Sequence, residues 1–159
     1  MKIKCIAIGN RIMRDDSIGI RVLEEISENL DREYFEIIIG ETDTDFVLSR
    51  IDDGDMFLIF DSTCMGIEPG TVTFTSMDNS SLHQHNQIYS QHQPNLIDMI
   101  NIYMKNAKGF IIGIEAKEIE FGTELSDVLE ARFKGICEEV KEFLISIRRE
   151  EHAWYFFVE

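Results

Sequence analysis

Short apolar runs alternate along this chain with stretches in which apolar residues recur every three or four positions, and this alternation constrains the fold most. Met56–Phe60 is five consecutive apolar residues, a pattern typical of a central parallel strand covered on both faces. The clearest helical stripe comes near the end of the chain, at Leu129, Phe133, Ile136, Val140, Phe143 and Ile147. Strands that alternate with helices predict βαβ units, and therefore an α/β fold with a mostly parallel sheet between helices.

The same reasoning locates the remaining elements. We expect strands at Ile3–Ile8, Phe35–Ile39, Met56–Phe60, Thr71–Thr75 and Gly109–Ile114. Helices are expected within residues 18–30, 46–51, 94–104 and 126–147, with Ser126 as the cap of the last one. Thr71–Thr75 alternates in polarity after a Pro-Gly turn, which favours an edge strand. Residues 76–93 are polar and predict a long exposed loop, and such loops in compact domains are often functional.

Length and hydropathy limit the organisation of the chain. Its 159 residues fit one domain, which we assign to residues 1–150, with residues 151–159 as an aromatic C-terminal tail. No apolar run approaches the ~18 residues of a membrane-spanning helix. The apolar run at the N-terminus is also too short for a secretory signal. We therefore expect a cytoplasmic protein without membrane insertion.

Charge and cysteine usage exclude several classes of partner. Thirty acidic and 15 basic residues give a net charge of −15, which repels phosphate backbones and argues against nucleic acid as a partner. Cys5, Cys64 and Cys137 have no paired metal-binding spacing, so we expect reduced, buried thiols. The glycine-rich loops of nucleotide-binding proteins are absent from the sequence.

Several reactive side chains are expected at one edge of the sheet, because ligands of open α/β sheets bind outside the carboxyl ends of the strands. Asp15 and Asp16 begin the first helix, Asp61 directly follows the central apolar run, and His92 precedes a helix that starts with Pro94. Neighbouring carboxylates repel unless they share a cation or a proton. Two carboxylates and one imidazole suit a borderline divalent ion such as nickel or zinc, with positions left open for another molecule.

Each of these residues also has a structural interpretation. Asp16 is well placed to cap the first helix, where its charge would favour the helix dipole. Asp61 is similarly placed to cap a turn, and His92 to be a solvated loop residue. Their joint placement at one edge favours the site over the three separate structural roles.

Five segments resemble the [NiFe]-hydrogenase maturation proteases. Residues 9–19, GNRIMRDDSIG, resemble the family's amino-terminal GN…DD…G motif, and residues 61–70, DSTCMGIEPG, resemble its second motif, an Asp followed by a GxxPG turn. Gln91-His92-Gln93 resembles the family's metal-contacting His segment. Residues 112–115 and 125–128 resemble its last strand and the entry to its last helix. The resemblance runs in order over roughly residues 3–147.

The resemblance implies a three-layer, phosphorylase/hydrolase-like fold with a five-stranded twisted sheet. It implies an endopeptidase that removes the C-terminal extension of a [NiFe]-hydrogenase large-subunit precursor after nickel insertion. Asp16, Asp61 and His92 would contact that nickel and form the catalytic set. The nickel arrives with the substrate, so no tightly bound cofactor of the chain's own is expected. Nickel can polarise the scissile carbonyl or lower the pKa of an attacking water, and the carboxylates can act as ligands or as a general base.

One segment departs from the family pattern, and two other functions remain as alternatives. The loop after the second strand usually carries two glycines, whereas this chain has Gly40-Glu41-Thr42, which adds an acid near a loop used for substrate selection. A phospho-accepting receiver domain would place Mg²⁺ on Asp15 and Asp16 and the phosphoryl group on Asp61, with Lys117 nearby. That interpretation leaves His92 without a role. The second alternative is a metal-binding maturation module that does not cleave.

Overall fold

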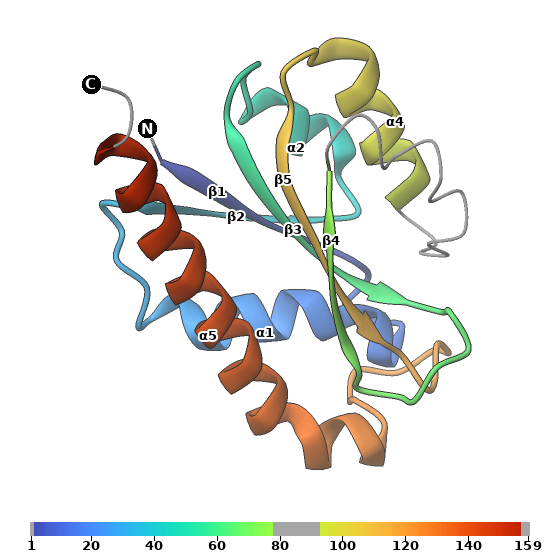
Figure 1. Cartoon of the computed structure of the whole chain (residues 1–159). Helices are drawn as coiled ribbons and strands as arrows, with labels where there is room; N and C mark the ends of the chain where they lie inside the picture. Colours follow the sequence, from blue (N-terminus) through green and yellow to red (C-terminus); the bar gives the residue numbers. More distant parts are fainter. Residues whose placement is uncertain (1, 78–92, 157–159) are drawn as a thin grey trace.

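A five-stranded sheet forms the centre of the computed structural model, which describes residues 2–77 and 93–156 of the chain (Figure 1). The strands are β1 (Ile3–Ile8), β2 (Phe35–Glu41), β3 (Met56–Thr63), β4 (Val72–Ser76) and β5 (Lys108–Glu115). They lie in the order β2-β1-β3-β5-β4, and all neighbours are parallel except β4 and β5. The expected α/β fold is therefore confirmed, with Met56–Phe60 in the central strand and β4 as an antiparallel edge.

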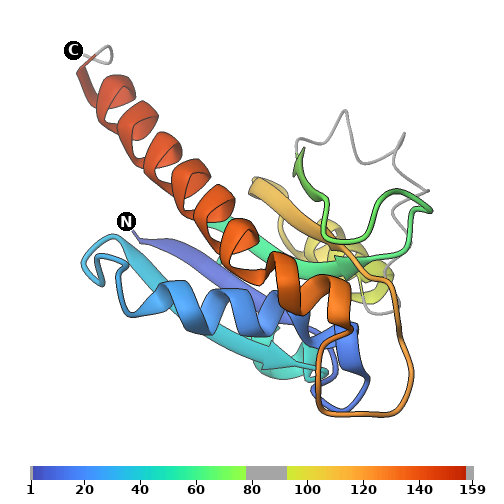
Figure 2. The same cartoon turned by 90° about the horizontal axis from the view of Figure 1, so that it is seen from below.

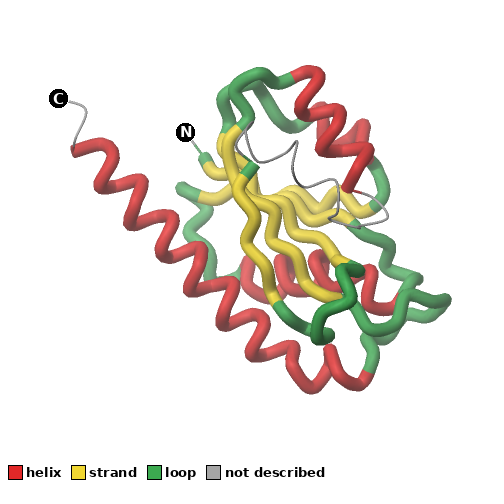
Figure 3. The backbone as a smooth tube through the Cα atoms, turned by 45° about the vertical axis from the view of Figure 1, so that its right-hand side comes forward, coloured by secondary structure: helices red, strands yellow, loops and turns green. Residues whose placement is uncertain are grey.

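Helices cover both faces of the sheet and produce the predicted three layers (Figure 3). They are the 3₁₀-helix η1 (Arg14–Ser17), α1 (Ile18–Ser27), α2 (Thr44–Ser49), α4 (Gln93–Tyr103) and α5 (Asp127–Phe156). Figures 1 and 2 show α1 and α5 on one face, and Figure 1 shows α2 and α4 on the other. The backbone of residues 151–156 continues α5 and does not leave it as a separate tail. Within residues 2–77 and 93–156, no helix is both long enough and apolar enough to cross a membrane.

The continuous apolar run of β3 is explained by the two hydrophobic clusters that it joins. Leu58 and Phe60 are buried in the cluster beneath α1 and α5, whereas Phe57 and Ile59 are buried in the cluster beneath α2 and α4. Burying one such side chain contributes roughly 1.5–3 kcal/mol. A polar residue at any of these four positions would therefore weaken one of the two interfaces that hold the layers together.

The first helix lies unusually close to the central strand because of one glycine. A Cβ atom built on Gly19 would lie 2.8 Å from the carbonyl carbon and oxygen of Phe60 and 2.9 Å from the backbone nitrogen of Asp61. These are backbone atoms of the central strand, which cannot move aside easily. The missing side chain thus lets α1 rest directly on β3 at Asp61.

We predict that Gly19→Ala lowers the free energy of unfolding by about 1–3 kcal/mol, because the added methyl group overpacks the α1–β3 contact. Gly135→Ala is the matched control, since Gly135 lies in α5 and a methyl group added to it would meet no atom within 4 Å. That control should be stabilised by roughly 0.5–1 kcal/mol. Urea denaturation measures both, and equal stability of Gly19→Ala and the unchanged chain would contradict the close approach.

Candidate functional site

Two of the three predicted site residues are joined through one serine. Asp16 lies in η1 and Asp61 in β3, and both carboxylates are buried. The Ser62 hydroxyl donates to Asp16 Oδ1 over 2.7 Å, and the Ser62 backbone N–H donates to Asp61 Oδ1 over 2.7 Å. Asp16 Oδ2 also accepts the backbone N–H of Asn10 at 2.9 Å. Asp16 and Asp61 therefore both contact Ser62, near the carboxyl end of the central strand.

The helix-capping interpretation of Asp16 does not hold. The residue that caps α1 is Ser17, and it makes no capping hydrogen bond through its side chain. The carboxylate of Asp16 instead accepts from Asn10 in the preceding loop and from Ser62 in the central strand. Asp16 therefore connects separate segments of the fold.

Asp61 is placed within a strand and not after one. The sequence predicted that β3 ends at Phe60, where the apolar run ends. Asp61, Ser62 and Thr63 instead continue the pairing with β5, opposite Gly113, Ile114 and Glu115. The strand continues because backbone hydrogen bonding to β5 does not require apolar side chains.

The third predicted residue, His92, lies outside the described residues, as do His83 and His85. In the part of the chain that the structure describes, no three His, Cys, Asp or Glu side chains are grouped closely enough to hold a metal ion. The described site therefore consists of two carboxylates, and the imidazole remains a prediction.

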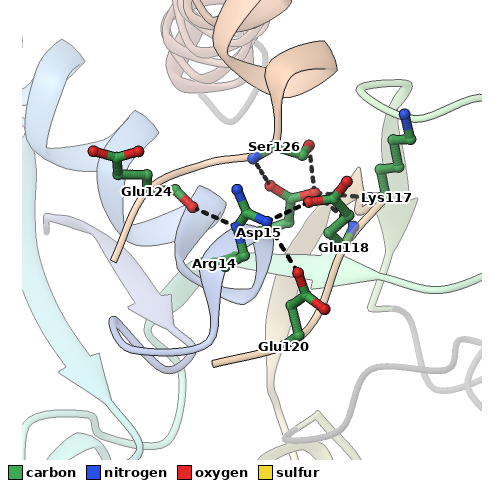
Figure 4. A network of polar contacts seen from close by, with 7 residues as sticks. All are labelled: Arg14, Asp15, Lys117, Glu118, Glu120, Glu124 and Ser126. Atoms are coloured by element: carbon green, nitrogen blue, oxygen red, sulfur yellow. Dashed lines mark hydrogen bonds and ion pairs between the residues drawn. The ribbon is translucent and has the colours of Figure 1, made fainter. Parts of the chain in front are cut away.

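Asp15, the neighbour of Asp16, has a structural role. Its Oδ1 accepts the Ser126 N–H at 2.7 Å, and its Oδ2 accepts the Ser126 hydroxyl at 2.7 Å and the N–H groups of Lys117 and Glu118 at 2.9 and 2.8 Å (Figure 4). These bonds use the oxygens that the receiver-domain alternative would need for Mg²⁺. The Ser126 hydroxyl, expected to cap the last helix, is directed to Asp15. Asp15 thus fastens η1 to the segment between β5 and α5.

Arg14 strengthens the same connection (Figure 4). Its Nη1 lies 2.6 Å from Glu118 Oε2 and 3.0 Å from Glu120 Oε1, and its Nε donates to the Glu124 carbonyl at 3.2 Å. The hydrogen bond to Glu120 raises the pKa of the Arg14 guanidinium. Arg14 adopts a φ of 45°, a conformation that costs a non-glycine residue roughly 1–2 kcal/mol. The surrounding contacts hold it there.

Glu115 is a positioning residue that the sequence analysis missed. It is buried at the end of β5, and its two carboxylate oxygens accept the N–H of Met65 at 2.6 and 2.9 Å. Its backbone carbonyl accepts the N–H of Gly70 at 2.8 Å. Glu115 thereby holds both ends of the loop after β3. The sequence feature that could have identified Glu115 is its position, because it is the acidic residue that ends the strand paired with the strand of Asp61.

Glu41, the departure from the family pattern, ends β2 with a φ of 52°. Its carboxylate lies 2.5 Å from Nε of Arg11, and Arg11 also pairs with Glu24 in α1. Hydrogen bonds to Glu24 and Glu41 raise the pKa of Arg11. The loop after β2 is thus connected electrostatically to the loop after β1.

Cys64 corrects one expectation, because its side chain is exposed while Cys5 and Cys137 are buried. Burial was expected from its position next to an apolar strand, but Cys64 is the first residue beyond β3, where the chain turns away. Partial burial, followed by the nearby carboxylates of Glu115, Asp16 and Asp61, raises the pKa of the Cys64 thiol. The thiol is therefore less readily ionised than a free cysteine.

We predict that Asp15→Asn lowers the free energy of unfolding by about 2–3 kcal/mol, because an amide replaces a charged acceptor of four hydrogen bonds. Hydrogen exchange should show residues 117–126 losing protection first. Asp98→Asn, an exposed carboxylate on α4, is the control and should change stability by less than about 0.5 kcal/mol. Unchanged protection of residues 117–126 in Asp15→Asn would contradict the fastening role.

We predict that iodoacetamide alkylates Cys64 more slowly at pH 8 than it alkylates a cysteine in an unstructured peptide, because a raised pKa leaves less thiolate. The rate should approach the peptide value only as the pH is raised further and the Cys64 thiolate forms. Burial, which raises the pKa of Cys5 to about 12 and that of Cys137 to about 11, should keep those thiols unlabelled. Mass spectrometry after timed quenching measures each site, and a peptide-like rate at pH 8 would contradict the assignment.

The chain is similar to known proteins in both sequence and structure. The family model described as HycI, hydrogenase maturation protease, matches residues 20–142, well over half of the chain. The chain is 23% identical over 145 residues to the hydrogenase expression/formation protein HoxM of Azotobacter vinelandii, covering 87% of this chain and 70% of that protein.

Two solved structures show the same fold. The [NiFe] hydrogenase maturation protease HybD from Thermococcus kodakarensis superposes with a TM-score of 0.72 at 28% identity, covering 90% of this chain and 99% of that one. The hydrogenase maturating endopeptidase HybD from E. coli also gives 0.72, at 23% identity and 94% coverage of both chains. The match of the family model, supported by these structures, establishes that the chain belongs to the hydrogenase maturation protease family.

Proposed function

We propose that this chain is the endopeptidase that removes the C-terminal extension from the large-subunit precursor of a [NiFe] hydrogenase after nickel has been inserted. Family membership supports the protease activity. The single observation that carries the proposal is the pair of buried carboxylates, Asp16 and Asp61, joined through Ser62. Two neighbouring carboxylates repel each other unless they share a cation or a proton, so this pair suits a cation that another molecule brings.

The position of α4 supports His92 as the third ligand. Asp61 follows Phe57 and Ile59 in β3 at steps of two residues, and side chains at such steps share one face of a strand. Phe57 and Ile59 pack on the α4 face, so the Asp61 side chain is directed to that face. α4 comes directly before β5 in the chain, so the C-terminal end of α4 lies toward the amino end of β5. The N-terminal end of α4, at Gln93, therefore lies toward the carboxyl edge of the sheet (Figure 1). His92 is the next residue back along the chain.

The chemistry then follows from the substrate's own metal. Asp16, Asp61 and His92 would complete the coordination of nickel that is already held by the precursor, which restricts cleavage to loaded molecules. The metal supplies Lewis acidity near the scissile carbonyl. One carboxylate accepts a proton from the attacking water, hydroxide adds to the carbonyl carbon, and the C–N bond breaks as the proton passes to the leaving amine. Ser62 keeps the two carboxylates oriented.

We predict that Asp16→Asn, Asp61→Asn and His92→Ala each reduce cleavage of a nickel-loaded precursor by about 100-fold or more, the usual contribution of a general base. Asp98→Asn should cleave at the unchanged rate. Gel analysis of the released mature subunit measures the rate, and the precursor without nickel should remain uncut. Circular dichroism of each variant separates loss of activity from loss of fold.

Three results would contradict the proposal in different ways. Unimpaired cleavage by His92→Ala would remove His92 from the site and leave the carboxylate pair. Equal cleavage of precursor with and without nickel would remove the metal from recognition and leave the protease activity. A chain that binds loaded precursor without cleaving it would be the non-cleaving maturation module.

A further inference from the structure

Two large apolar side chains are exposed beside the site, on segments that lie next to each other. Phe121, in the segment between β5 and α5, is 82% exposed, and Ile12, in the loop after β1, is 46% exposed. Met13 and Gly122 form a parallel bridge, and parallel pairing places the preceding residues, Ile12 and Phe121, alongside each other. We refer to Ile12 and Phe121 together as the apolar rim.

The apolar rim is fixed relative to the carboxylate pair. The Gly122 N–H donates to the Ile12 carbonyl at 2.9 Å, and the Arg14 N–H donates to the Gly122 carbonyl at 3.0 Å. Asp16 follows Arg14 by two residues in the same 3₁₀-helix. The apolar rim and Asp16 are therefore parts of one hydrogen-bonded unit, built from the end of the β1 loop, η1 and the segment between β5 and α5.

The segment that carries Phe121 is held firmly although the side chain itself is exposed. Arg14 pairs with Glu118 and Glu120 on this segment, and Asp15 accepts its N–H groups (Figure 4). A Cβ atom on Gly122 would lie 3.0 Å from Cγ of Arg14, so the absence of a side chain at Gly122 leaves room for the Arg14 side chain. A rigid aromatic loses little conformational entropy on binding, and such residues are typical anchors of protein interfaces.

Acidic residues border the apolar rim. Glu120 is largely exposed and Glu124 is exposed, while Glu118 is half-buried. With the net charge of −15, the rim favours a partner whose apolar contact is surrounded by Lys and Arg side chains, and disfavours a second copy of this acidic chain.

We propose that the apolar rim is a docking site for the folded body of the large-subunit precursor, next to the segment that is cut. This inference rests on the proposed function, since it takes the precursor as the occupant. Docking at Phe121 and Ile12 holds the precursor while its nickel meets Asp16 and Asp61. The partner surface is an apolar patch with a basic border.

The test compares two exposed apolar pairs at opposite edges of the sheet. One double variant is Phe121→Ala with Ile12→Ala. The control is Tyr103→Ala with Ile102→Ala, because Tyr103 and Ile102 are 68% and 71% exposed at the end of α4, near the amino edge where β5 begins. All four residues are exposed, so both double variants should fold, as thermal denaturation can verify.

Steady-state cleavage of nickel-loaded precursor gives kcat and KM separately. We expect the rim variant to raise KM about tenfold or more with kcat within twofold, as removal of an anchor that binds the ground state and the transition state equally does. The control should keep both constants within twofold. Phe121→Glu in place of Phe121→Ala should raise KM further, because the apolar contact would remove the glutamate charge from water without a partner.

The outcomes separate this inference from the proposed function. If the unchanged chain cleaves the precursor and the rim variant has the same KM, the docking site is wrong and the protease activity stands. An equal rise of KM in the control pair would also overturn it, since the effect would not be local. If the unchanged chain does not cleave loaded precursor, both proposals fail together.

Discussion

The structure depends on keeping two acidic side chains buried near one edge of the sheet. Withdrawing an ion from water costs several kcal/mol unless hydrogen bonds replace the lost hydration. Ser62 and Asn10 supply such bonds to Asp16, and the Ser62 N–H supplies one to Asp61. This arrangement requires η1 to reach the end of β3, which in turn requires the close contact of α1 at Gly19. The packing of the fold and the geometry of the site therefore depend on the same contact, between the first helix and the central strand.

Two adjacent aspartates divide this work between them. Asp15 is directed away from the carboxylate pair, toward the segment between β5 and α5, and Asp16 toward Ser62. The 3₁₀ conformation of η1 separates neighbouring side chains by about a third of a turn, so successive residues serve opposite sides of one short helix. The acidic pair is thus a structural residue followed by a site residue.

The order of the elements could be predicted because hydrophobic periodicity reflects burial directly. Met56–Phe60 had to be central, since only a strand covered on both faces is apolar throughout, and the topology of a parallel sheet then brought Asp16 and Asp61 to one edge. The partners of Asp15 could not be predicted, because they lie far along the chain and three of the four hydrogen bonds come from backbone N–H groups. Backbone pairing with β5 likewise extends β3 beyond Phe60, and Cys64, which follows the strand, is exposed. Neither effect leaves a trace in local hydropathy.

The conformation of Glu41 has a consequence for which residues the loop after β2 can carry at this position. Its φ of 52° is the left-handed geometry that glycine adopts without cost, and the salt bridge to Arg11 keeps a glutamate in it. The backbone path is therefore compatible with either residue. Exchanging them leaves the contour of the loop intact and changes the charge that the loop carries and its salt bridge to Arg11.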